Sequence, residues 1–108
     1  MSDPVRAITH RLRRCCADLA ELTLDHAESS EWRTLLFDGG RHRITLLLRG
    51  DGSDKALAAM REEMVDPAFA LPGHLLADIK LAAVQSDGDS LRIDIEALTL
   101  EDGLAVSV

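Results

Sequence analysis

The stretch HLLADIKLAAVQSDGDSLRIDIEALTLE, residues 74–101, carries the clearest structural pattern in this chain. Apolar and polar side chains alternate along its two halves, and the glycine-containing segment Ser86–Ser90 lies between them. Alternation with a period of two places one set of side chains on a buried face and the other in water. A glycine-containing connection of this length is typical of a β-hairpin. We therefore predict an antiparallel hairpin from His74 to about Glu101.

Two amphipathic helices are predicted before this hairpin. The dipeptide Asp3-Pro4 is a typical helix start, with aspartate as the N-cap and proline at the first helical position. Apolar residues then recur every three or four positions, and we expect this helix to end near Asp18. A second helix, capped by Ser53 or Asp54, is predicted through about Val65, because Asp66 precedes a proline and such residues avoid the helical conformation.

Three short strands are predicted between the two helices, over residues 20–25, 32–37 and 43–49. A polar loop over residues 26–31 separates the first two, and a turn over residues 38–41 separates the second from the third. The predicted order of elements is therefore α-β-β-β-α-β-β. Helices with one apolar face beside antiparallel strands favour an α+β fold. We predict a two-layer sandwich with a mostly antiparallel sheet of about five strands and two helices on one face.

The length and charge of the chain limit its partners. At 108 residues it is predicted to form a single α+β domain over residues 1–108. A formal net charge of −7 repels phosphate backbones, so nucleic acid is not an expected partner. The arginines of the first helix are interpreted as a solvated face, with contact to an acidic surface as the alternative. No apolar run approaches the roughly 18 residues that a membrane span needs, so we expect no membrane partner.

The cysteines and the missing motifs indicate a compartment and argue against a cofactor. Cys15 and Cys16 are adjacent, cannot easily reach disulfide geometry with each other, and fit a reducing, cytoplasmic environment. Cys15 lies on the apolar side of the first helix, where a cysteine packs as a small hydrophobic residue, so we interpret the thiols as structural. The sequence contains no metal-ligand spacing and no phosphate-binding loop. We expect neither a cofactor nor a metal.

One segment before the hairpin has no purely structural explanation. Residues 69–74 combine an aromatic ring, a rigid Pro-Gly bend and an imidazole. His42 begins a predicted strand, and with His74 and Asp78 it forms an acid–base or metal site if the sheet register brings the three together. The alternative is that the histidines are surface residues at strand ends and that the loop plugs the end of the sheet. The candidate ligand pocket comprises His42, Phe69, Pro72, Gly73, His74 and Asp78.

The outer face of the predicted sheet carries more apolar residues than a solvated face needs. If Ile79 and Leu81 face the helices, the residues of opposite parity face outward, and a bulge near Ala97 decides whether the last leucines do so too. Apolar patches of several hundred Å² are seldom left exposed on monomers. The candidate association face comprises Leu47, Leu76, Val84, Leu98 and Leu100.

These observations give two hypotheses about function. The first is a small, non-enzymatic cytoplasmic domain that acts through protein association as a homodimer. The alternative is a small-ligand-binding protein or minor enzyme, its small molecule unidentified, with a pocket near His42, Phe69 and His74. A concave pocket on which both histidines converge would favour the alternative.

Overall fold

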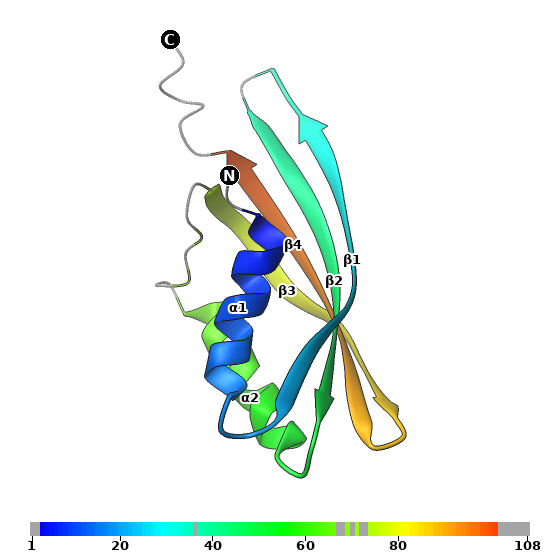
Figure 1. The fold of residues 1–108 in the computed structure, drawn as a ribbon. Coiled ribbons are helices and arrows are strands. Elements are labelled where there is room, and N and C mark those ends of the chain that lie inside the picture. The colour runs from blue at the N-terminus through cyan, green and yellow to red at the C-terminus, as the bar shows by residue number, and fades with distance from the viewer. Residues whose placement is uncertain (1–2, 36, 67–68, 70, 72–73, 102–108) are drawn as a thin grey trace.

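The structure is a computed structural model that describes residues 3–35, 37–66, 69, 71 and 74–101. Its elements follow the order α-β-β-α-β-β (Figure 1). They are α1 (Pro4–Cys16), β1 (Glu21–Arg33), β2 (Asp38–Arg49), α2 (Ser53–Val65), β3 (His74–Asp87) and β4 (Ser90–Glu101).

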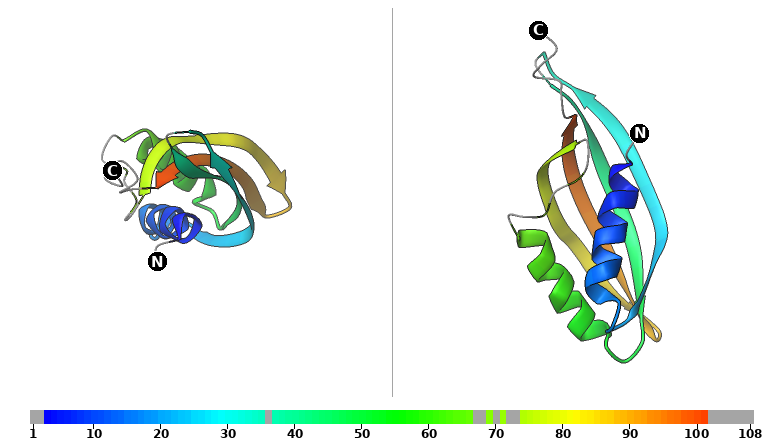
Figure 2. Two further views of the ribbon diagram at one scale, coloured as in Figure 1. Left: turned by 90° about the horizontal axis from the view of Figure 1, so that it is seen from above. Right: turned by 60° about the vertical axis from the view of Figure 1, so that its left-hand side comes forward.

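The strands form one antiparallel sheet in the order β1-β2-β4-β3, so that β2 and β4 are the central pair. Both helices lie against the same face of this sheet (Figures 1 and 2). The expected α+β fold is therefore confirmed. Neither helix in the described part of the chain has the length and apolar character needed to cross a membrane.

The number and order of the strands differ from the prediction. β1 runs without interruption through residues 26–31, which were expected to form a loop, and it pairs with β2 as far as Arg33. The chain reverses direction between Arg33 and Asp38 instead, where the amide of Thr34 donates to the carbonyl of Phe37 over 2.8 Å. The cause is that residues 28–31 are exposed whichever way they point, so this half of β1 shows no apolar alternation. Four strands therefore replace the predicted five.

Gly39 and Gly40 lie inside β2 and not in the predicted turn. A Cβ atom on Gly39 would collide with the carbonyl oxygen of Thr99 and would lie 2.9 Å from the ring of Trp32. A Cβ atom on Gly40 would lie 2.9 Å from the ring of His42. These glycines therefore allow close packing on both faces of the strand.

α1 begins as the sequence predicts, whereas the N-cap of α2 is Gly52 and not Ser53 or Asp54. The carboxylate of Asp3 accepts a hydrogen bond of 3.0 Å from the amide of Val5, which is the capping contact expected at the start of α1. α1 ends at Cys16, slightly before the predicted end, and α2 spans Ser53–Val65 and ends where the sequence predicts. Arg11 joins the two helices, because its Nε lies 2.7 Å from Glu63 Oε1 and its guanidinium lies 4.6 Å from the centre of the Phe69 ring.

Aliphatic side chains fill the space between helices and sheet. The largest of them are at most 1% exposed and come from both helices and the two central strands. Burying an aliphatic side chain of this size contributes roughly 1.5–3 kcal/mol to the free energy of unfolding. The set consists of Ile8, Leu12, Ile44, Leu46, Leu48, Met60, Ile93 and Ile95.

Candidate functional site

The helices cover one face of the sheet, and no described element covers the other, which we call the open face (Figure 2). Residues opposite one another on paired strands point to the same face, so the register arranges the open face in rows from β1 to β3. Three rows concern the site. The apolar row is Trp32, Gly39, Leu100 and Leu75, the mixed row is Ser30, Arg41, Leu98 and Asp78, and the charged row is Glu28, Arg43, Glu96 and Lys80.

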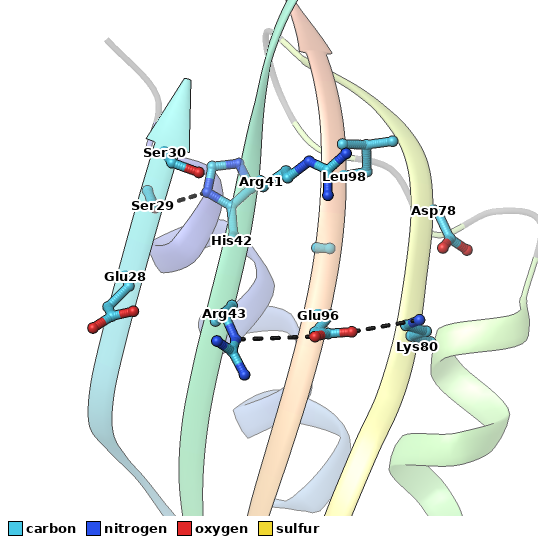
Figure 3. A pocket seen from close by; sticks show the side chains of 11 residues that line it. Glu28, Ser29, Ser30, Arg41, His42, Arg43, Asp78, Lys80, Glu96 and Leu98 are labelled. Atoms are coloured by element: carbon cyan, nitrogen blue, oxygen red, sulfur yellow. Dashed lines mark hydrogen bonds and ion pairs between the residues drawn. The ribbon is translucent and has the colours of Figure 1, made fainter. Parts of the chain in front are cut away.

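A hollow of about 760 Å³ lies along the mixed and charged rows (Figure 3), and Ser29, His42 and Ala97, from the row between these two, also line it. Glu96 lies between two cations there, with its carboxylate 3.9 Å from Arg43 Nε and 3.4 Å from Lys80 Nζ. Exposed pairs of this kind contribute about 1 kcal/mol or less each to the free energy of unfolding. The charges of this row alternate in sign across the sheet from β1 to β3, in the order Glu28, Arg43, Glu96 and Lys80.

The mixed row carries two further charges on either side of Leu98. Arg41 extends from β2 toward Leu98 (Figure 3), and Asp78 lies on the neighbouring edge strand β3. Within the part of the chain that the structure describes, neither Arg41 nor Asp78 has a hydrogen-bond or ion-pair partner. Both groups are therefore free to pair with a molecule that covers the open face.

The apolar row closes the end of the open face beside the β1–β2 turn. The ring of Trp32 lies across Gly39, whose missing side chain makes room for it. Leu75 is 56% exposed and lies opposite Leu100. This end of the face therefore offers apolar surface to a partner.

His42 lies on the other side of the sheet, among the residues beneath the helices, and is 5% exposed. Its Nδ1 is 2.8 Å from Ser29 Oγ on β1, and its Nε2 is 2.9 Å from Thr99 Oγ1 on β4. The Thr99 hydroxyl donates in turn to the carbonyl of Gly40, so we assign the proton to Nε2 and let Ser29 donate to Nδ1. The imidazole links three strands.

The surroundings of His42 favour its neutral form. Burial, followed by the nearby His74, lowers the pKa of His42, whereas Asp3 acts in the opposite direction. A neutral imidazole with one donor and one acceptor matches the two hydroxyl partners. The arrangement explains a buried polar group in an otherwise aliphatic layer.

The structure divides the candidate pocket predicted from the sequence. His42 and His74 face the helix side of the sheet, whereas Asp78 faces the open side, so the three do not form one site. Phe69 is buried and contacts Arg11, and residues 72–73 (Pro72 and Gly73) lie outside the described residues. His42 and Asp78 line the hollow, but Phe69 and His74 do not. Among the described residues no group of three or more His, Cys, Asp or Glu side chains is placed to hold a metal ion.

The candidate association face is also divided. Leu98 and Leu100 point to the open face because β4 pairs with β2 without a bulge, and Leu47 points the same way. Leu76 and Val84 point to the helix side, opposite Thr99 and Ile93, which corrects the prediction. The reason is that β3 contains two register shifts, at Leu76/Asp78 and at Leu81/Ala83. At each shift, the odd-numbered and even-numbered residues exchange the faces to which they point.

The two thiols lie at the end of α1, with their sulfur atoms 3.8 Å apart. Cys16 is fully buried and contacts the carbonyl of Ala56 on α2 at 3.6 Å. Burial raises the pKa of the Cys16 thiol to about 12, and burial also raises the pKa of Cys15. Both cysteines therefore remain protonated at neutral pH, which suits packing and disfavours nucleophilic chemistry.

Comparison with known proteins supports the fold. No protein-family model matches the sequence, and a comparison with curated proteins gives no match. Among solved structures, a chain from the virion of a native gene transfer agent particle superposes with a TM-score of 0.60 at 14% sequence identity. The alignment covers 94% of this chain and 100% of that chain. At this identity the similarity shows a shared fold.

The charged row and the cross-strand link of His42 are not predicted from the sequence. Glu28 and Ser29 fall in the loop predicted over residues 26–31, whereas the structure places both on β1. The signal that was available is the alternation around His42, where two arginines flank it and Ile44 follows. That pattern predicts a histidine on the buried face of a strand and arginines on the solvated face.

Proposed function

We propose that the protein is a non-enzymatic association module that binds a second copy of itself through the open face of its sheet. The observation that carries this proposal is the sheet face that no described element covers. That face bears a strip of apolar side chains at one end, including the exposed Leu75, together with a hollow lined by charged groups. Surfaces that combine apolar and charged groups in this way favour protein partners.

The fold comparison adds a second line of support. A chain of the same fold forms part of the virion of a gene transfer agent particle, and the similarity extends over the whole length of that chain. A virion is an assembly of protein subunits, so this fold is compatible with a role in protein assembly. We propose the same general role, association, for this chain.

Sedimentation equilibrium over a wide concentration range tests the proposal. An interface limited to one small sheet face falls in the size range of weak complexes, so dimers are expected to form in the micromolar range. A protein that stays monomeric at high micromolar concentration contradicts the proposal.

A second candidate is the binding of a small molecule in the hollow. Its volume of about 760 Å³ falls within the range of known ligand pockets, which is roughly 300–1,000 Å³. Unpaired Arg41 and Asp78 suit a ligand that carries both charges. Backbone NMR titration with glycine betaine as the probe tests this candidate, which requires saturable shifts at those two residues.

A further inference from the structure

We infer that two copies pack open face to open face about a two-fold axis that runs parallel to the strands, midway between β2 and β4. This inference rests on the proposed association and specifies its geometry. Rotation about such an axis keeps each row opposite the same row of the second copy. It reverses the order of the strands within that row. β1 then lies over the second copy's β3, and β2 lies over its β4. An interface of this kind requires a surface that is complementary to itself under the rotation.

The charged row meets this requirement at every position. Its charges run negative, positive, negative and positive from β1 to β3, so the reversed row presents the opposite charge at each point. Glu28 then faces Lys80 of the second copy, and Arg43 faces its Glu96. An axis through β4 instead would place Glu96 against its own counterpart, with like charges in contact. The charges therefore specify the axis position.

The apolar row places apolar groups opposite one another. Leu100 faces Gly39 of the second copy, and the ring of Trp32 lies across that glycine, so the leucine meets an aromatic ring. Trp32 faces the exposed Leu75 of the second copy, so an aromatic ring meets an aliphatic side chain. This contact removes from water the apolar surface that each copy alone exposes.

The mixed row and the hollow are also compatible with this axis. Ser30 faces Asp78 of the second copy, so a hydroxyl donor meets a carboxylate that has no partner within the described residues. Arg41 faces Leu98 of the second copy, across which its aliphatic stem can lie. Two hollows of about 760 Å³ then face one another and give room to the long arginine and lysine side chains. Aligned sheets pack at about 30°, so the rows stay opposite each other here and diverge toward the other end of the strands.

Glu28 and Lys80 provide the sharpest test, because within one chain they lie on opposite edges of the sheet. Three strand spacings of about 4.8 Å separate them, so any coupling between them acts across the interface. Glu28→Lys places like charges together at two symmetry-related points, and so does Lys80→Glu. We expect each variant to weaken the dimer at least about tenfold in sedimentation equilibrium. An equimolar mixture of the two, one isotopically labelled and followed by native mass spectrometry, is expected to form the heterodimer preferentially.

Matched controls separate the contact from overall charge. Glu62→Lys and Arg61→Glu make comparable charge changes on exposed residues of α2, and we expect neither to alter dimerisation. Glu28→Lys reduces the net negative charge of −7, whereas Lys80→Glu increases it, so bulk repulsion predicts opposite effects from the two variants. The inferred contact predicts that both weaken the dimer.

The outcomes separate the proposed association from the inferred position of the two-fold axis. Weakening by both variants with recovery in the mixture supports the inferred axis. A wild-type dimer that neither variant weakens, or a mixture that fails to recover, overturns this axis and leaves the association function standing. A wild-type protein that remains monomeric at high micromolar concentration overturns both.

Discussion

The two faces of this sheet are built from alternate residues of the same strands and have opposite properties. On β2, Ile44 and Leu46 are buried beneath the helices, while Arg43, between His42 and Ile44, is largely exposed on the open face. The covered face is aliphatic and closely packed, whereas the open face presents charges in an ordered alternation. The comparison indicates that stability resides on the covered face, which leaves the open face available for the association that we propose. Substitutions on neighbouring residues should therefore have separable effects.

The largest effect is expected from truncating one residue on each face of β4. Ile95 has no exposed surface, and Ile95→Ala should lower the free energy of unfolding by about 2–5 kcal/mol because it removes buried methylene groups and leaves a cavity. Leu98, on the open face, should cost less than about 1 kcal/mol when replaced by alanine. Urea denaturation at concentrations where the protein is monomeric measures both values. Equal losses would show that the open face is part of the folding core.

The second effect is alkaline destabilisation through Cys16. Burial raises the pKa of its thiol from 9.0 to about 12, so above pH 9 the unfolded chain loses a proton that the folded protein retains. The free energy of unfolding should therefore fall as the pH rises from 9 toward 12, by about 2–3 kcal/mol at pH 11. The chain has no tyrosine, which leaves few other groups that titrate in this range.

Denaturation curves between pH 8 and about pH 11 measure this decline. The Cys16→Ala variant lacks the thiol and should show a flatter profile than the wild type. A wild-type profile that is equally flat would mean that the thiol is reached by water in the folded state.

The third effect concerns the link between the two helices on the covered face. Arg11→Ala removes both the ion pair with Glu63 and the contact with the ring of Phe69, and should lower the free energy of unfolding by about 1–2 kcal/mol. Arg14→Ala, on the exposed side of the same helix, is the matched control and should change it by less than about 0.5 kcal/mol. Thermal unfolding followed by circular dichroism compares them. Similar losses in both variants would attribute the effect to helix propensity and not to the link.

The elements that sequence analysis predicted well depend on local rules. Asp3-Pro4 fixes the start of α1 through capping, and Asp66-Pro67 fixes the end of α2 through a steric clash between neighbours. The β3–β4 hairpin follows from alternation and a short glycine-containing turn. In each case the deciding interaction joins residues that are close in sequence.

The elements that sequence analysis missed depend on pairing at a distance. The exposed half of β1 has no apolar alternation, and only its hydrogen bonds to β2 make it a strand. The bulges of β3 turn Leu76 and Val84 to the helix side of the sheet, and nothing in the side-chain pattern marks the positions of these bulges. The charged row requires the register of four strands at once. The charged row can therefore be identified only from the pairing of all four strands.

The smallest effect we expect is acid destabilisation through His42, the polar exception on the covered face. Burial, with a contribution from His74, lowers the pKa of His42 below its usual value of 6.5. As the pH falls below 6.5 the unfolded chain takes up a proton that the folded protein resists, so the free energy of unfolding should decrease toward lower pH. The slope from one such group cannot exceed about 1.4 kcal/mol per pH unit. Urea denaturation between pH 7.5 and about pH 5 measures it.

The His42→Gln variant separates the charge from the hydrogen bonds. It should be less stable than the wild type at neutral pH, because the hydroxyls of Ser29 and Thr99 lose the geometry of their shared partner. Its stability should nevertheless change less between pH 7 and pH 5, since the amide does not titrate. An unchanged acid slope in this variant would assign the acid sensitivity to other groups and would leave His42 with a purely structural role.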